Sequence, residues 1–253
     1  MSEGGAADEA SEVPDVLRDG VGTGGAGDGA PAWWARELEA LRARFDVVET
    51  EVMCGNRRFV LAHPRNAESL IDEEAFEQDE RLPYWADVWP SARVLAEHVA
   101  RHKGNGRRAL ELGCGSGLVA CALAHAGYRV TATDYYPEAL EFTRVNVARN
   151  TGRRIATRMV DWRDMPRDLG RFDVVVASDV LYEHTHGDLV AEAVLATVSD
   201  DGYALIADPG RLSLANFLAS AEEGGMALTE HWTTPFEEGA QKQQIQLHVL
   251  RVR

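Results

Sequence analysis

Cysteine is scarce in this chain, and the few cysteines are not paired. Cys54, Cys114 and Cys121 are widely separated and form no C-x-x-C motif, so the sequence indicates neither a disulfide framework nor a zinc site. No apolar run approaches the roughly 20 residues of a membrane-spanning helix, and no basic segment followed by an apolar one opens the chain. We therefore expect a cytoplasmic protein that binds no metal and does not contact membranes.

Positive charge is also scarce. The chain has 26 Lys and Arg residues against 41 Asp and Glu residues, for a formal net charge of -15, whereas nucleic-acid binding depends on clustered Lys and Arg. A nucleic-acid partner is therefore not expected, and a basic protein segment is an easier partner. The 253 residues, 45% of them hydrophobic, are enough for one large α/β domain with a small extension.

The composition changes along the chain. Residues 1–30 contain seven acids and one arginine but almost no large apolar side chain. Such a segment cannot offset the entropy of ordering, and we expect it to be a disordered acidic tail. In residues 31–81 the pattern predicts an extension made of a helix from Pro31 and a β-hairpin with its turn near Gly55. Residues 82–253 are expected to form the main, ligand-binding domain.

The most informative segment is E-L-G-C-G-S-G, from Glu111 to Gly117. It follows a short apolar run, predicted as a strand, and precedes an apolar helix and a second strand that ends at Asp134. Small residues let backbone N–H groups approach a ligand closely at a helix N-terminus. A carboxylate at the end of the next strand, roughly 20 residues on, can bind two ribose hydroxyls. The segment therefore predicts a site for a nucleoside-bearing ligand.

The spacing of Gly113, Gly115 and Gly117 separates two kinds of ligand. A dinucleotide site has the pattern G-x-G-x-x-G, and here Leu118 occupies the position of the third glycine. Glu111 at the end of the strand suits a cationic ligand such as a sulfonium nucleoside. The E-L-G-x-G-x-G pattern resembles motif I of the seven-strand S-adenosylmethionine-dependent methyltransferases, which implies S-adenosylmethionine as the cofactor. A nicotinamide-dependent oxidoreductase is the alternative.

Short apolar segments alternate with helical ones after the glycine segment, which is typical of a parallel sheet covered by helices on both faces. The last two, 226–232 and 243–250, differ, because apolar residues such as Leu247 alternate with polar ones such as His248. This pattern predicts an antiparallel hairpin. We therefore expect a Rossmann-like seven-strand methyltransferase sheet of the α/β class, mostly parallel with a C-terminal antiparallel hairpin. The parallel strands are predicted at 109–112, 129–133, 155–160, 172–177 and 203–207.

Ligands of such sheets bind beyond the carboxyl ends of the strands, and polar residues follow several of the predicted strands. After the third, Asp161 could accept a hydrogen bond from an adenine amino group and Trp162 could stack on the ring. The alternatives are a surface acid and a core aromatic residue. Asp179, after the fourth, could also begin an ordinary strand-to-helix turn. The predicted cofactor-binding residues at these ends are Glu111, Gly113, Gly115, Gly117, Asp134, Tyr135, Asp161, Trp162 and Ser178.

Three further strings carry a closer resemblance. D-V-L-Y, from Asp179 to Tyr182, resembles the D-x-x-Y motif of the protein-lysine methyltransferases called methyltransferase family 16. In that group the motif lies beside the methyl group and takes part in lysine binding, which implies Asp179 and Tyr182 as the catalytic residues. P-Y-W-A-D-V-W-P at 83–90 and D-P-G-R at 208–211 resemble the group of the electron-transfer-flavoprotein β-subunit lysine methyltransferase. That resemblance implies that Trp89 lies against the cofactor; an aromatic plug between extension and sheet is the alternative.

The type of methyl acceptor follows from what surrounds the D-x-x-Y motif. Methyltransferases that act on adenine or glutamine amides carry an N-P-P-Y-type turn here, whereas Val180 and Leu181 stand in place of the prolines. A carboxylate with a nearby phenol suits an amine, which Asp179 could orient and stabilise while water removes its proton. The residues around the motif differ from those of the enzyme it resembles, which leaves the exact substrate open.

One segment suggests a different chemistry. Glu183 to Asp188 holds two histidines, which could bind a metal or serve as a base for a hydroxyl acceptor. We expect instead a solvated loop that caps the following helix. The sequence as a whole predicts an enzyme, an S-adenosylmethionine-dependent methyltransferase that N-methylates a lysine of a protein and acts as a monomer. The alternatives are a small-molecule N-methyltransferase that acts on a small amine, and an inactive partner module that binds the cofactor.

Overall fold

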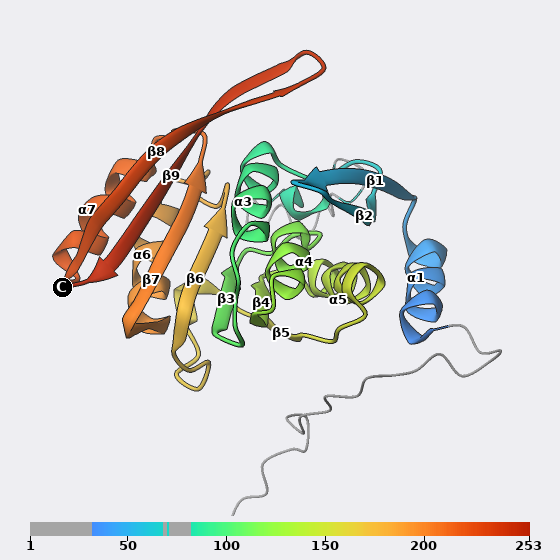
Figure 1. The fold of residues 1–253 in the computed structure, drawn as a ribbon, viewed down its shortest axis with the longest axis horizontal. Helices are drawn as coiled ribbons and strands as arrows, with labels where there is room; N and C mark the ends of the chain where they lie inside the picture. Colours follow the sequence, from blue (N-terminus) through green and yellow to red (C-terminus); the bar gives the residue numbers. More distant parts are fainter. Residues whose placement is uncertain (1–31, 68–69, 71–81) are drawn as a thin grey trace, which may run out of the picture. The chain divides into compact units, whose positions relative to one another are not determined.

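The computed structural model describes residues 32–67, 70 and 82–253, so the predicted acidic tail 1–30 lies outside the described residues. The described part contains a seven-stranded sheet and a separate two-stranded one (Figure 1). The strand order of the larger sheet is β5-β4-β3-β6-β7-β9-β8. Its strands are β3 (Arg108–Leu112), β4 (Arg129–Asp134), β5 (Ala156–Met159), β6 (Phe172–Ser178), β7 (Val198–Asp208), β8 (Met226–Glu238) and β9 (Gln241–Val252).

Strands β3 to β7 are parallel to one another. Strand β9 runs antiparallel to its two neighbours, β7 and β8. The strand order reverses between β3 and β6, and this switch point is where open α/β sheets bind their ligands. The predicted α/β class, with a mostly parallel sheet and a C-terminal antiparallel hairpin, is confirmed. The hairpin is longer than predicted, because β8 and β9 remain paired from Thr234 to Glu238, past the end of β7. Pro235 is tolerated there because β8 is an edge strand.

Helices cover both faces of the sheet, because the strand residues on each face are apolar. In β3, Ala109 belongs to the apolar core beneath α3 (Pro90–Ala100) and α4 (Leu118–His125). Its neighbour Leu110 belongs to the opposite core, beneath α6 (His186–Thr197) and α7 (Leu214–Glu223). Successive side chains of a strand point to opposite faces, so β3 is buried on both. No helix in the described ranges is long and apolar enough to cross a membrane.

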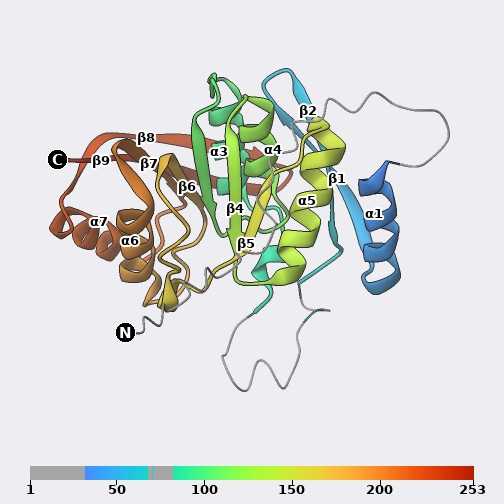
Figure 2. The same ribbon diagram turned by 90° about the horizontal axis from the view of Figure 1, so that it is seen from below.

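The N-terminal extension packs on α5 (Pro137–Thr151). Helix α1 (Trp33–Arg44) and the antiparallel pair β1 (Val47–Cys54) and β2 (Arg57–Pro64) lie on the side of α5 that faces away from the sheet (Figures 1 and 2). A helix and a hairpin therefore lie where the sequence indicates them. The division of the chain at residue 82 stays a prediction.

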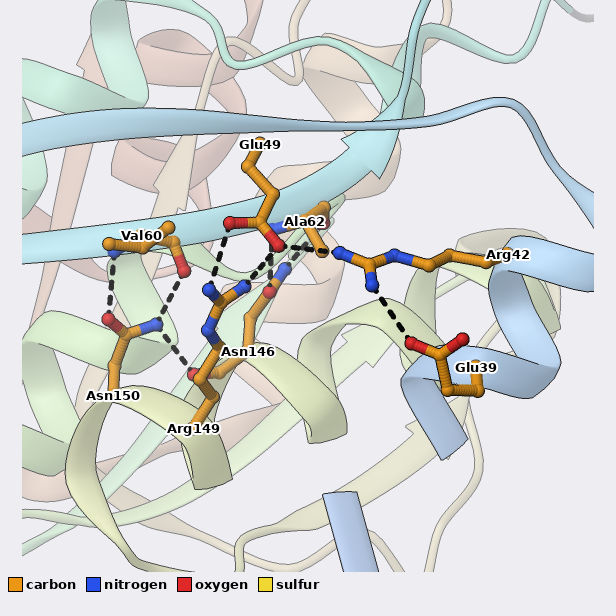
Figure 3. A network of polar contacts seen from close by, with 8 residues as sticks. All are labelled: Glu39, Arg42, Glu49, Val60, Ala62, Asn146, Arg149 and Asn150. Carbon is orange, nitrogen blue, oxygen red and sulfur yellow. Dashed lines mark hydrogen bonds and ion pairs between the residues drawn. The ribbon is translucent and has the colours of Figure 1, made fainter. Parts of the chain in front are cut away.

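Two asparagines of α5 hold the outer edge of β2. Asn146 accepts a hydrogen bond from the backbone N–H of Ala62 and donates one to its carbonyl, both at 2.8 Å. Asn150, one helical turn later, binds the N–H and carbonyl of Val60 at 2.8 and 2.9 Å. One turn of helix advances about 5.4 Å and two residues of strand about 6.6 Å, so both amides reach alternate residues of the strand. Figure 3 shows the two amides aligned along β2.

Charged side chains surround this contact on its solvent side. Glu49 of β1 lies between Arg149 of α5 and Arg42 of α1, each at 2.8 Å, and Arg42 also pairs with Glu39 at 2.9 Å (Figure 3). These pairs are partly or largely exposed, and exposed ion pairs contribute about 0–1 kcal/mol. The buried amide contacts therefore account for most of the polar attachment of the hairpin to α5.

Replacement of Asn146 tests that conclusion. Asn146→Ala leaves the buried N–H and carbonyl of Ala62 unpaired, so we expect the free energy of unfolding, measured in urea, to fall by about 2–4 kcal/mol. Asn150→Ala, at a half-buried position, should cost about 1–2 kcal/mol. Glu39→Gln is the control and should cost less than about 0.5 kcal/mol. Equal effects of Asn146→Ala and Glu39→Gln would show that the hairpin does not depend on the amide.

Candidate active site

A cavity of about 590 Å³ opens at the carboxyl ends of β3, β4, β5 and β6. It is closed on one side by the 3-10 turn η2 (Tyr84–Ala86) and the start of α3. Eleven of the twelve predicted site residues line it: Trp89, Glu111, Gly113, Gly115, Asp134, Tyr135, Asp161, Trp162, Ser178, Asp179 and Tyr182. The arrangement brings residues that are distant in sequence to one edge of the sheet, as expected for a ligand site in this kind of fold.

The glycine loop is shaped by close contacts on each side. Gly113, Gly115 and Gly117 all have positive φ angles, of 68°, 52° and 84°. A side chain on Gly113 would lie 2.8 Å from Val180 Cγ1, and one on Gly115 would lie 3.0 Å from the carbonyl oxygen of Trp85. Gly117 does not line the cavity; a side chain there would collide with Thr143 of α5 at 2.6 Å. Two glycines therefore border the cavity, and the third allows α4 to pack on α5.

Two buried carboxylates form an acidic wall beside the loop. Asp134 accepts hydrogen bonds from the backbone N–H groups of Gly115 and Tyr136, at 2.9 and 3.0 Å. Burial raises the pKa of Asp134 to about 6. Glu111 is 2% exposed, and its Oε2 has no hydrogen-bond partner among the described residues. Burial, and then the charge of Asp134, raise the pKa of Glu111 well above its usual range. A cationic ligand would compensate both charges.

The wall at the end of β5 is polar and aromatic. Trp162 opens the short 3-10 turn η3 (Trp162–Asp164), and its ring meets the His186 ring edge-on, with centroids 5.3 Å apart. Asp161 accepts a hydrogen bond from the N–H of Arg163 and pairs with its guanidinium at 2.7 Å. An adenine amino group would therefore share Asp161 with Arg163. The roles predicted for Asp161 and Trp162 in cofactor binding stay predictions.

Asp179 is held in place from three elements. Its backbone has a φ of 59°, an uncommon value for a residue with a side chain, and its N–H donates to the carbonyl of Ala207 in β7 at 3.0 Å. The guanidinium of Arg211 donates to Oδ1 at 2.6 Å, and Ser91 Oγ of α3 donates to Oδ2 at 3.0 Å. The sequence interpretation did not identify Arg211 or Ser91, although the D-P-G-R string after β7 was a signal for Arg211.

An aromatic cluster lies next to Asp179. Tyr84 of η2 meets Trp89 and Tyr182 edge-on, with ring centroids 6.0 and 5.2 Å apart. The indole N–H of Trp89 donates to the carbonyl of Tyr84 at 2.8 Å, and the guanidinium of Arg211 lies 5.9 Å from the Trp89 ring centroid. Trp89 therefore lines the cavity and also joins η2 to α3, and its contact with the cofactor stays a prediction.

The segment from Glu183 to Asp188 is not simply a solvated loop, and this prediction is wrong for His186. That residue begins α6 and is 6% exposed. Its Nδ1 donates to the carbonyl of Val180 at 2.7 Å, and its Nε2 lies 3.2 Å from a carboxylate oxygen of Glu183. Its ring is buried because it packs against Trp162 and Tyr182. Within the described ranges, no group of three or more His, Cys, Asp or Glu side chains is arranged to hold a metal ion.

Comparison with solved structures supports the fold. A TehB-like SAM-dependent methyltransferase from Corynebacterium glutamicum matches with a TM-score of 0.50 and 21% identity, over 71% of this chain and 97% of that one. The glycopeptide N-methyltransferase MtfA, complexed with S-adenosyl-L-methionine, matches with a TM-score of 0.51 and 15% identity, over 64% of this chain and 94% of that one. At these identities the likeness concerns the fold.

Comparison with characterised sequences identifies the family. The protein-lysine methyltransferase METTL21E of Mus musculus is 35% identical over 114 residues, covering 40% of this chain and 46% of the relative. The electron transfer flavoprotein beta subunit lysine methyltransferase of Danio rerio is 29% identical over 141 residues, covering 51% of each. The chain thus spans about half the length of the curated relatives it matches. A family model described as lysine methyltransferase matches residues 72–212, which is more than half of the chain, and the chain belongs to the lysine methyltransferase family.

Proposed function

We propose that this chain is an S-adenosylmethionine-dependent methyltransferase that N-methylates a lysine side chain of a protein substrate. One observation carries the proposal: a single cavity joins the glycine loop and its two buried acids to the D-x-x-Y motif at Asp179 and Tyr182. The chain's net charge of -15 supports a basic protein segment as substrate. We take the enzyme to act in the cytoplasm as a monomer, without a nucleic-acid or membrane partner.

The cofactor end of the cavity has the groups that S-adenosylmethionine requires. The carboxylate of Asp134 accepts the backbone N–H groups of Gly115 and Tyr136 and lines the cavity, where it can also accept hydrogen bonds from ribose hydroxyls. The unpartnered Oε2 of Glu111 suits the cationic part of the ligand. Gly113 and Gly115 line the cavity without side chains, and a Cβ at either position would press against Val180 or Trp85. When bound, S-adenosylmethionine supplies an electrophilic methyl group on a positively charged sulfur.

The acceptor end orients an amine. The acceptor nitrogen must carry a free lone pair, so a lysine loses its ammonium proton to water before it reacts. Transfer would form a bond between this nitrogen and the methyl carbon and break the methyl–sulfur bond, whose electron pair would go to sulfur. Asp179 accepts an N–H of the amine, and Tyr182, 39% exposed at the cavity wall, completes the acceptor pocket. The chain contributes alignment and charge stabilisation, and no covalent step.

Ligand-induced stabilisation tests the cofactor. S-adenosylhomocysteine should raise the melting temperature of the protein and NADH should not, because a ligand that binds only the folded state stabilises it by mass action. Asp134→Ala should weaken binding of S-adenosylhomocysteine by roughly a hundredfold or more in calorimetry, since it removes two charge-assisted bonds that cost about 1.5–3 kcal/mol each. Asp168→Ala, which removes an exposed carboxylate paired with Arg158, is the control. Stabilisation by NADH alone would contradict the assignment.

Glu111→Gln tests the second acid. The raised pKa of Glu111 means that folding favours its protonated form, so the ligand-free protein loses stability as the pH rises above 4.5, the ordinary value for this carboxyl. In urea unfolding the variant should be more stable than wild type by about 1–3 kcal/mol near pH 8, and nearly equal to it near pH 4. Its affinity for S-adenosylhomocysteine should nevertheless fall. A stability difference that is the same at both pH values would argue against a charge buried at Glu111.

Methyl labelling tests the reaction. The enzyme and tritiated S-adenosylmethionine are added to a lysate that lacks the gene, and labelled proteins are identified by mass spectrometry. We expect label on lysine, and Asp179→Asn should lower the rate by roughly a hundredfold with little change in cofactor affinity. The chain contains only two lysines, Lys103 and Lys242, so self-labelling is separable by mass. Label only on small amines, or cofactor binding without any transfer, would contradict the proposal.

A further inference from the structure

The acceptor end of the cavity contains a cation that the reaction as written does not use. Arg211 places Nε and Nη2 each 2.6 Å from Oδ1 of Asp179. A carboxylate that faces a cationic substrate would ordinarily pair with the substrate's ammonium group. Here its charge is already balanced within the protein. Asp179 and Arg211 together present no net charge to an incoming amine.

We propose that Arg211 is a positioning residue that keeps Asp179 paired, so that the site binds the acceptor amine in its neutral, reactive form. The inference rests on the proposed function and adds to it the protonation state that the site selects. An ammonium group next to Arg211 meets a like charge, and this repulsion lowers the pKa of the amine. A neutral amine is not repelled, and it can donate an N–H to Asp179 Oδ2, which among the described residues accepts only Ser91 Oγ and retains acceptor capacity.

The loop after β7 is built to hold Arg211 in this place. Asp208, the last residue of β7, is fully buried, and its Oδ1 accepts the backbone N–H groups of Gly210 and Arg211, both at 2.7 Å. Gly210 has a φ of 91°, which favours glycine at this turn. The guanidinium lies over the Trp89 ring, and the Arg211 side chain is only 32% exposed. Arg211 is therefore fixed by its backbone, by an aromatic face and by its carboxylate partner.

The other charged groups at the cavity leave this effect in place. Arg163 is paired with Asp161 at the opposite end, and Glu183 lies against His186. Burial raises the pKa of Asp87, and also that of Asp208, which interacts electrostatically with Asp179 and Arg211; in both cases the neutral form is favoured. Arg211 is therefore the cation beside Asp179 among the described cavity residues. The titratable side chains that line the cavity are Tyr84, Asp87, Glu111, Cys114, Asp134, Tyr135, Tyr136, Asp161, Arg163, Asp179, Tyr182, Glu183, His186 and Arg211.

Three variants separate charge from geometry. Arg211→Gln removes the charge and keeps a polar side chain, whereas Arg211→Lys keeps the charge and loses the fork of N–H donors. Arg101→Gln is the control, because it removes an arginine that is paired with Glu97 on the surface of α3 and lies outside the cavity. Melting temperatures with S-adenosylhomocysteine establish that each variant is folded before it is compared with wild type.

The first measurement is the binding of n-butylamine, a mimic of the lysine side chain, to the protein saturated with S-adenosylhomocysteine. Between about pH 7 and pH 9 the wild-type affinity should rise roughly tenfold per pH unit, because only the neutral amine binds. Arg211→Lys and Arg101→Gln should follow the same slope. Arg211→Gln exposes the charge of Asp179 and should bind the ammonium form, so its affinity should change less than about twofold. A wild-type affinity that does not depend on pH, or parallel slopes in wild type and Arg211→Gln, would overturn the inference.

The second measurement is turnover of the protein that methyl labelling identifies. At about pH 7.5 the kcat of Arg211→Gln should be roughly tenfold below that of wild type without a rise in KM, and the deficit should shrink towards about pH 9. A purely structural role would lower kcat by the same factor at every pH and raise KM. If wild type methylates no lysine, the proposed function fails on that result, while the n-butylamine titration still decides the role of Arg211.

Discussion

Buried negative charge at one edge of the parallel sheet is the constraint around which this structure is organised. Four carboxylates are buried near the carboxyl ends of β3, β4, β6 and β7: Glu111, Asp134, Asp179 and Asp208. A charge buried without a partner costs several kcal/mol, and the chain supplies partners of different kinds. Backbone N–H groups serve Asp134 and Asp208, and a guanidinium serves Asp179. Of the two carboxylates that keep an unpartnered oxygen among the described residues, Glu111 and Asp208, only Glu111 lines the cavity. The electrostatics of the edge therefore direct a cationic ligand towards Glu111.

The positions of these acids could be predicted from the sequence, whereas their partners could not. Locating Glu111, Asp134 and Asp179 requires only that short apolar segments be recognised as parallel strands, since the residues at the carboxyl end of each strand then lie at the ligand-binding edge. Pairing Asp179 with Arg211 requires in addition that β6 lie next to β7 with Ser178 opposite Ala207. The contact with Ser91 requires that the start of α3 lie against Asp179, although the two residues are 88 positions apart in the sequence. Such contacts depend on register and on helix placement, which local patterns do not specify.

The surroundings of two residues, His186 and Gly117, could not be predicted from the sequence for a common reason: their neighbours in other elements were unknown. His186 sits in a run of polar residues, yet it is buried because Trp162 and Tyr182 pack on its ring and both of its nitrogens face oxygen atoms. Gly117 belongs to the glycine motif, yet its missing side chain makes room for Thr143 rather than for a ligand. In each case the residues that surround the position come from another element, so the local sequence does not reveal them.

Helix α5 connects the N-terminal extension to the cofactor end of the cavity. Thr143 Oγ1 donates to the carbonyl of Gly115 at 2.9 Å, and Asn146 donates to that of Ser116 at 2.8 Å. Two carbonyls of the glycine loop therefore accept hydrogen bonds from side chains of this helix. The amide of Asn146 also binds Ala62 of β2. Residues three apart lie on the same face of a helix, and this face therefore supports the loop from one side and the hairpin from the other. The backbone N–H of Gly115 donates to Asp134, so the shape of the cofactor wall depends on a helix that begins only three residues beyond that acid. The glycine motif therefore does not form the cofactor wall alone. Its carbonyls accept hydrogen bonds from the polar face of α5, and the same face binds the hairpin of the extension.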